Sequence, residues 1–188
     1  MSQSINIVKS KLEELPNNIE AEQSVIGSVL LANEIFDDIS IIISSKNFYD
    51  PVHKKIFEAL EKLIYSGLLA NPITLKNYFE KEKDDLNIPE YLVKITKFST
   101  SSRQAIEYSK LIFDLFVKRE LIKISGEVID QAKLNDLDID GKKIIENYEK
   151  SLFDLAEKGS FSSSLIKFDE AMRQTIEMAS NAYKNEEG

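Results

Sequence analysis

Residues 102–133 of this 188-residue chain, SRQAIEYSKLIFDLFVKRELIKISGEVIDQAK, decide its fold class. The stretch has no proline, and its apolar residues recur every three or four positions, as in an α-helix. They form two stripes: Ile106, Phe113, Val117, Leu121, Ile124 and Val128, and Tyr108, Ile112, Leu115, Ile122 and Ile129. Together the stripes make a face wider than one neighbouring helix can cover. We therefore predict a long helix that must bury apolar surface on more than one side.

An acidic turn, LNDLDIDG at 134–141, separates this helix from a second one that extends to about residue 158. Asp140 is a candidate N-cap for the second helix, and the apolar stripe of that helix is Ile145, Tyr148, Leu152 and Leu155. Two helices joined by a short turn form an antiparallel hairpin, which we place at 101–158. The two helices of the hairpin carry more apolar surface than they can bury against each other. This surplus must meet either the first half of the chain or another copy of it.

The first half of the chain predicts shorter helices. All four prolines lie in its first 89 residues, and proline is tolerated at the front of a helix but not inside one. Helices are predicted at 19–32, 35–44, 51–66, 74–81 and 89–97. A serine- and threonine-rich break, FSTSS at 98–102, then ends a compact helical head at 15–100, and residues 1–14 form an N-terminal tail.

Local signals mark where several of these helices start and end. The asparagine pair at 17–18 can cap the first helix, and Asp50-Pro51 is an acidic N-cap followed by proline at the first helical position. Gly67 ends the helix that Pro51 begins. Gly27, inside the first helix, costs about 1 kcal/mol relative to alanine, so we expect another backbone to pack closely against it.

The last part of the chain predicts a tethered helix. GSFSSS at 159–164 is typical of a flexible linker, which we place at 159–167. The helix at 168–188 has a narrow apolar stripe made of Phe168, Met172, Ile176, Ala179 and Tyr183. A single tethered helix cannot bury such a stripe on itself. We therefore expect it to dock in a groove of another domain or subunit.

Composition and charge exclude several classes of protein. The formal net charge is −8, so the chain repels DNA at long range and is not expected to bind it strongly alone. The absence of cysteine excludes disulfides, thiolate metal sites and a cysteine nucleophile, and it fits a cytoplasmic protein. No window approaches the roughly 18 apolar residues that span a bilayer, and the N-terminus lacks the apolar core of a secretory signal.

No catalytic, cofactor-binding or metal-binding residues are predicted. The six glycines lie too far apart to form a phosphate-binding loop such as GxxxxGK[ST]. His53 is the only histidine and stands at a helix start, where we expect a local hydrogen bond. A metal–carboxylate helical bundle is the enzymatic alternative, but it needs more histidines. The acidic turn spaces Asp136, Asp138 and Asp140 like part of a calcium loop, yet Asn147 stands where that loop needs a bidentate glutamate.

A basic cluster on the long helix has two interpretations. Lys118, Arg119 and Lys123 could form a docking patch for a partner. Acidic residues are interleaved with them, however, and this pattern favours an ordinary solvated helix face.

Two blocks of residues resemble the N-terminal part of DnaB-type replicative DNA helicases. PNNIEAEQSVIG at 16–27 resembles the family's opening signature, P-x-[SN]-x-E-A-E-Q-x-[VL]-[LI]-G, and FYDPVHKKIF at 48–57 resembles its F-Y-x-x-x-H-x-x-I-F block. Gly67 before the Thr74-Leu75 pair, and residues 108–122, match as well. The resemblance covers the chain from about residue 14. The signature residues, to which we assign structural roles, are Glu20, Ala21, Glu22, Gln23, Gly27, Pro51, His53 and Phe57.

The resemblance implies an all-α protein with a compact helical head, a long antiparallel hairpin and a tethered linker helix. It implies that hairpins pair between subunits to make dimers, and that three dimers form a hexameric collar. The hairpin interface would comprise Ile106, Phe113, Val117, Leu121, Ile124, Val128, Ile145, Tyr148 and Leu152. The linker helix would dock on a neighbouring subunit.

The same resemblance implies partners and a division of labour. The primase C-terminal domain and a helicase loader would dock on the collar, and single-stranded DNA would be bound only through the full ring. ATP and Mg²⁺ would belong to a RecA-like ATPase domain expected after the linker helix, whereas the sequence stops at Gly188. This chain alone would then be no enzyme, and it would act at the replication fork in the bacterial cytoplasm. The alternative is a free-standing helical regulator that caps or inhibits helicase rings.

Overall fold

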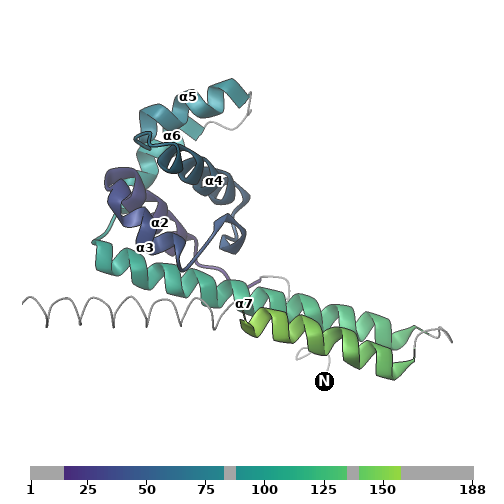
Figure 1. Ribbon diagram of the computed structural model, residues 1–188. Helices are drawn as coiled ribbons and strands as arrows, with labels where there is room; N and C mark the ends of the chain where they lie inside the picture. The colour runs from purple at the N-terminus through teal and green to yellow at the C-terminus, as the bar shows by residue number, and fades with distance from the viewer. Residues whose placement is uncertain (1–14, 83–87, 135–139, 158–188) are drawn as a thin grey trace, which may run out of the picture. The chain divides into compact units, whose positions relative to one another are not determined.

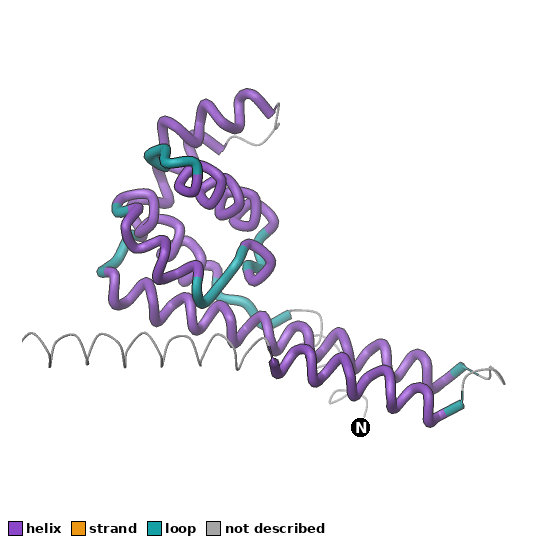
Figure 2. Tube along the Cα trace, viewed as in Figure 1, coloured by secondary structure: helices purple, strands orange, loops and turns teal. Residues whose placement is uncertain are grey.

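The computed structural model describes residues 15–82, 88–134 and 140–157. All regular secondary structure in these ranges is helical (Figures 1 and 2), which confirms the all-α prediction. The predicted tail at 1–14, linker at 159–167 and linker helix at 168–188 lie outside the described residues. The chain divides into two compact units, Met1–Gly126 and Glu127–Gly188.

The first unit contains most of the helices. They are α2 (Ile19–Leu31), α3 (Phe36–Ser40), α4 (Pro51–Tyr65), α5 (Pro72–Glu82), α6 (Ile88–Ile95) and the larger part of α7 (Ser102–Lys133), with short 3-10 turns η1 (Asn33–Ile35), η2 (Ser45–Asn47) and η3 (Thr96–Phe98) between them. The long helix at 102–133 is thus confirmed.

Helix α2 is the centre of the first unit. It begins at Asn18, whose side-chain oxygen accepts a hydrogen bond from the Ala21 N–H at 2.9 Å, so the second asparagine of the predicted pair is the cap. The helix contacts α4, α6 and η3. Because partners surround it, its buried residues occur on most sides rather than on one stripe. They are Ala21, Glu22, Val25, Ile26, Gly27, Ser28, Val29 and Leu30.

Helix α4 starts and ends as its sequence predicts. The Asp50 carboxylate accepts the Val52 N–H at 2.7 Å, and Pro51 occupies the first turn. At the other end Gly67 has a φ of 72°, a conformation that L side chains rarely adopt. The Leu68 N–H donates to the Leu63 carbonyl and the Gly67 N–H to the Ile64 carbonyl, which is the Schellman arrangement.

The largest differences from the predicted helix lengths are in α3 and α5. Residues 35–44 contain the expected short buried helix, but α3 covers only Phe36–Ser40. Helix α5 starts at Pro72, two residues before the predicted Thr74, because the Asn71 side chain accepts the N–H groups of Ile73 and Thr74 at 2.9 and 3.0 Å. Asparagine caps helices well, so this start could have been predicted.

The core of the first unit gathers side chains from every one of its α-helices. Phe57 of α4 lies against Phe36 and Phe48, with ring centroids 5.4 and 4.9 Å away. The largest fully buried side chains are Phe36, Phe48, Phe57, Ile26, Ile39, Ile56, Leu60, Leu75, Leu92, Ile95 and Ile112. Ile112 belongs to α7, so part of the apolar face of that helix is covered by the head.

The second unit contains the end of α7 and a helix at 141–157, which run side by side in opposite directions (Figure 1). Asp140 caps the second helix, since its carboxylate accepts the Lys143 N–H at 2.8 Å. Leu155 is buried, whereas Ile145 and Phe153 are each 67% exposed. No helix among the described residues is long and apolar enough to cross a membrane.

Gly27 is a point of close backbone approach between α2 and the end of α6. A Cβ added at Gly27 would lie 2.5 Å from the Ile95 carbonyl oxygen and 3.2 Å from the Ser99 nitrogen. Ser28 also holds this segment, because its hydroxyl accepts the Thr100 N–H at 2.9 Å. The predicted close packing against Gly27 is confirmed, and the glycine leaves room for the segment that leads into α7.

We predict that Gly27→Ala destabilises the first unit by about 1–3 kcal/mol, because backbone atoms must move to admit the methyl group. Gly126→Ala is the matched control, since Gly126 also lies inside a helix and nothing stands within 4 Å of an added Cβ. There the same change should stabilise by up to about 1 kcal/mol. Urea unfolding measures both, and equal effects would contradict the close approach.

Candidate functional site

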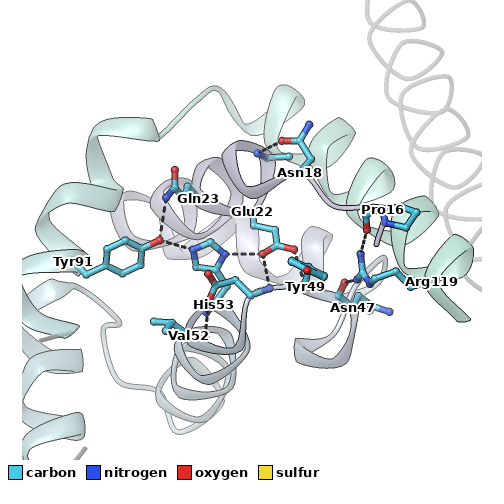
Figure 3. A network of polar contacts seen from close by, with 12 residues as sticks. Pro16, Asn18, Glu22, Gln23, Asn47, Tyr49, Val52, His53, Tyr91 and Arg119 are labelled. Carbon is cyan, nitrogen blue, oxygen red and sulfur yellow. Dashed lines mark hydrogen bonds and ion pairs between the residues drawn. The ribbon is translucent and has the colours of Figure 1, made fainter. Parts of the chain in front are cut away.

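The Glu22 carboxylate in α2 is the centre of a polar network that joins several helices of the first unit (Figure 3). Its side chain is 2% exposed. One oxygen accepts the Tyr49 N–H at 2.6 Å, and the other accepts the Asp50 N–H at 3.3 Å and the His53 Nδ1–H at 2.7 Å. A buried carboxylate is costly unless donors surround it, and short charge-assisted bonds of this kind are strong. Glu22 therefore joins α2 to the loop before α4 and to α4 itself.

The network continues through His53 to Tyr91 of α6. The second ring nitrogen of His53, Nε2, lies 2.6 Å from the Tyr91 hydroxyl, and Gln23 Nε2 donates to that hydroxyl at 3.0 Å. The two rings are stacked, with centroids 5.9 Å apart. Since the Glu22 carboxylate accepts at Nδ1, a single proton on Nδ1 leaves Nε2 free to accept the Tyr91 O–H. Both ring nitrogens of His53 and the Tyr91 hydroxyl then have partners.

The electrostatics of the network favour a protonated Tyr91. Burial raises the pKa of Tyr91, and the nearby charges of Asp50 and Glu22 raise this pKa further, while the hydrogen bond from Gln23 lowers it. The hydroxyl therefore keeps its proton and remains the donor to His53. His53 is completely buried, so its nitrogens are closed to a substrate. This arrangement can hold three segments in register, which is the structural role assigned to His53.

The structure corrects one expectation about His53. Its ring does not make a local hydrogen bond: both ring partners come from other helices, 31 and 38 residues away in sequence. Only the backbone N–H of His53 bonds locally, to Asp50 at 3.4 Å. The periodicity places His53 on the inner face of α4, and an imidazole buried there must find its partners on whatever packs against that face.

Arg119 of α7 forms a second polar tie (Figure 3). Its guanidinium donates to the Pro16 carbonyl at 2.7 Å and to the Asn47 carbonyl at 2.5 Å, and it lies 5.6 Å from the centroid of the Tyr49 ring. Burial lowers the pKa of Arg119, and the charge of Glu22 opposes this shift. Arg119 thus fastens α7 to the chain on both sides of α2.

The basic cluster on α7 is therefore not one patch. Lys118 is exposed and pairs with Asp114 at 2.6 Å, as a solvated face predicts. Arg119 is half-buried and fastened to the head, so the solvated-face interpretation is wrong for this residue. The sequence carries no signal that separates the two, because the distinction depends on which side of α7 meets η2.

The comparisons with known proteins identify the family. Residues 14–114, more than half of the chain, match the family model described as DnaB-like helicase N terminal domain. This chain belongs to that family.

The relatives of this DnaB-like domain are replicative helicases. The chain is 34% identical over 173 residues to the replicative DNA helicase DnaB of Rickettsia conorii and 35% identical to that of Rickettsia bellii, covering 91% of this chain and 35% of each relative. For Pasteurella multocida DnaB the identity is 31% over 153 residues, 79% of this chain and 32% of that protein. The chain thus spans about a third of the length of these relatives.

A solved structure has the same fold. The crystal structure of the N-terminal domain of DnaB helicase from Mycobacterium tuberculosis superposes with a TM-score of 0.69, covers 75% of this chain and 99% of that chain, and is 20% identical in sequence. The likeness supports the helical architecture described above.

Several signature residues of the DnaB-like domain hold the structure together. Gln23 donates a hydrogen bond to the Tyr91 hydroxyl, and Gly27 leaves room for the backbone at the end of α6. Pro51 is the first residue of α4, and Phe57 is fully buried in the core. Glu20 is exposed in the first turn of α2, where an acidic side chain suits the helix dipole. Among the described residues, no group of three or more His, Cys, Asp or Glu side chains could hold a metal ion.

The predicted hairpin interface of the DnaB-like domain stays a prediction, but the exposure of its residues can be described. The exposed members are Leu121, Ile145 and Leu152, and the half-buried members are Ile106, Phe113, Val117, Ile124, Val128 and Tyr148. The face of α7 that packs on the head is instead formed by Ala105, Ser109 and Ile112. The docking residues Phe168, Met172, Ile176, Ala179 and Tyr183 lie outside the described residues.

We predict that Glu22→Gln destabilises the domain by about 1–3 kcal/mol, because an amide that replaces one carboxylate oxygen leaves buried donors without an acceptor. Glu20→Gln is the matched control: it removes the same charge from the same turn at an exposed position, and should change stability by no more than about 0.5 kcal/mol. The measurement is urea unfolding followed by circular dichroism. Similar losses for both variants would contradict the role given to Glu22.

Proposed function

We propose that this chain is the N-terminal assembly and docking part of a bacterial replicative DNA helicase. In this role it joins subunits into dimers and a hexameric ring, and it offers a surface to the primase C-terminal domain and to a helicase loader. ATP binding, hydrolysis and unwinding would belong to a motor domain, and single-stranded DNA would pass through the assembled ring. The chain itself would carry out no catalysis, and its place of action would be the replication fork in the cytoplasm.

The exposed apolar surface along the two long helices carries the proposal. Side chains that a folded monomer would bury stand in solvent there: Leu121, Ile122, Ile129, Ile145, Leu152 and Phe153 are each between 40% and 67% exposed. Large apolar side chains left exposed in this number are typical of an interaction site. The replicative helicases among the relatives make subunits of the same protein the natural partner. They also favour the helicase role over a free-standing regulator.

The buried polar groups support an assembly role as well. In the Glu22–His53–Tyr91 network both ring nitrogens of His53 are occupied by hydrogen bonds, so a substrate cannot reach them. The Arg119 guanidinium likewise donates its hydrogen bonds to carbonyl groups of the chain. The network ties α2, α4 and α6 together, and Arg119 ties α7 to Pro16 and Asn47. A rigid helix presents a better preorganised interface than a mobile one.

We predict that Leu121→Glu weakens self-association by about tenfold or more without unfolding the chain. Leu121 is 40% exposed, so a charge there is tolerated in the monomer but becomes costly when a partner buries it. Light scattering coupled to size exclusion, from about 1 to 100 μM, gives the change in mass. Circular dichroism checks the fold.

Leu69→Glu is the control for this substitution, because Leu69 is 65% exposed in the loop before α5. It should leave association unchanged. Unchanged association of Leu121→Glu, or an equal loss in both variants, would contradict the assembly role of the stripe.

A further inference from the structure

A basic hollow lies in the first unit between the η2–α4 segment and α7. Its volume is about 420 Å³. Its apolar lining includes Phe48, which is buried, and Phe116 and Ile122 of α7. Ile122 is 46% exposed, so the hollow opens directly onto the apolar surface of α7.

Three lysines line the hollow without a counter-ion. Lys46 lies in η2, Lys54 in α4 and Lys123 in α7, and among the described residues no side-chain ammonium of the three forms a salt bridge or a hydrogen bond. Other lysines of α7 do pair, such as Lys118 with Asp114 and Lys110 with Glu107. The hollow therefore has unbalanced positive charge in a chain whose net charge is −8.

Two further charged residues line the hollow and do not cancel this excess. Arg119 adds a positive charge, although its guanidinium already donates to the carbonyl groups of Pro16 and Asn47. Glu120 supplies a single carboxylate. The four cationic groups outnumber it, so the hollow fits a ligand that is acidic and apolar together. Nucleic acid is a poor candidate, because the whole chain repels phosphates.

The chain itself contains a segment with this chemistry. Residues 134–140, LNDLDID, alternate three aspartates with two leucines and an isoleucine and contain no basic residue. Leu134 is 61% exposed, and Asp140 is exposed at the start of the following helix. Residues 34–40 are also acidic, but they are not available, because Phe36 and Ile39 are fully buried in the core.

We propose that residues 134–140 of one copy of the chain dock in the basic hollow of another copy. The aspartates meet Lys46, Lys54 and Lys123, and the apolar residues cover Phe116 and Ile122. This proposal rests on the proposed assembly function, and it names residues through which two copies meet. In a two-fold symmetric pair it forms twice, since each copy supplies one hollow and one acidic segment. Opposite charges then set the register that an apolar stripe alone leaves undefined.

The test uses charge reversal on either side of the contact. One variant carries Lys46→Glu and Lys123→Glu in the hollow, and the other carries Asp136→Lys and Asp138→Lys in the segment. Asp140 is left unchanged because it caps a helix. Lys94→Glu with Lys97→Glu is the control, since both lysines are exposed and lie outside the hollow. Sedimentation equilibrium measures the association constant of each variant and of an equimolar mixture of the first two.

Each variant alone should associate about tenfold more weakly than wild type, because like charges then face each other in both contacts. The mixture should recover most of the wild-type affinity, because each mixed pair restores attraction at both contacts. Net charge does not explain such recovery, since the wild-type −8 changes by four units and both variants stay negative. The control should behave as wild type.

The alternative outcomes are distinct. Wild-type association in either variant, or no recovery in the mixture, overturns the contact while leaving the apolar interface intact. An occupant from a different protein, or the segment of the same chain, would also leave self-association unchanged and overturn it. A wild-type chain that stays monomeric throughout overturns the proposed assembly function itself.

Discussion

The buried carboxylate of Glu22 is the interaction on which the rest of the head depends. A charge removed from water must be compensated by donors, and here they come from Tyr49, Asp50 and His53. By holding the backbone at 49–50, Glu22 fixes the loop from which the Asp50 side chain caps α4. By orienting His53 it also sets the position of Tyr91 and thus of α6. One side chain of α2 therefore determines how two other helices pack.

The segment at residues 47–49 also connects the head to α7. Asn47 stands just before the loop held by Glu22, and its carbonyl accepts a hydrogen bond from Arg119. The Tyr49 ring lies beside the same guanidinium. Because α7 is fastened at this point and packed at Ile112, its remaining apolar face is held outward. Leu121 and Ile122 of this face are accordingly 40% and 46% exposed.

Much of the fold follows from local signals in the sequence. Asp50-Pro51, Gly67 and the proline-free stretch at 102–133 each specify a start, an end or a continuation through the backbone of a few neighbouring residues. Gly27 could be predicted because a helical glycine needs a packing reason. The Tyr91 and Arg119 contacts could not, since they join residues 38 or more positions apart and no local pattern encodes which faces meet. The family motif identifies Glu22 and His53 but says nothing of their bond.

Amide hydrogen exchange at Tyr49 tests the central role of Glu22 most directly. Tyr49 lies in the loop before α4, and its N–H donates to the Glu22 carboxylate at 2.6 Å. If this bond organises the head, the Tyr49 amide exchanges only when the domain unfolds, as slowly as amides inside α2 and α4. Leu69, whose amide makes no hydrogen bond among the described residues, supplies the reference for a fast loop amide. Exchange of Tyr49 as fast as that of Leu69 would show that the loop opens freely and would contradict the account.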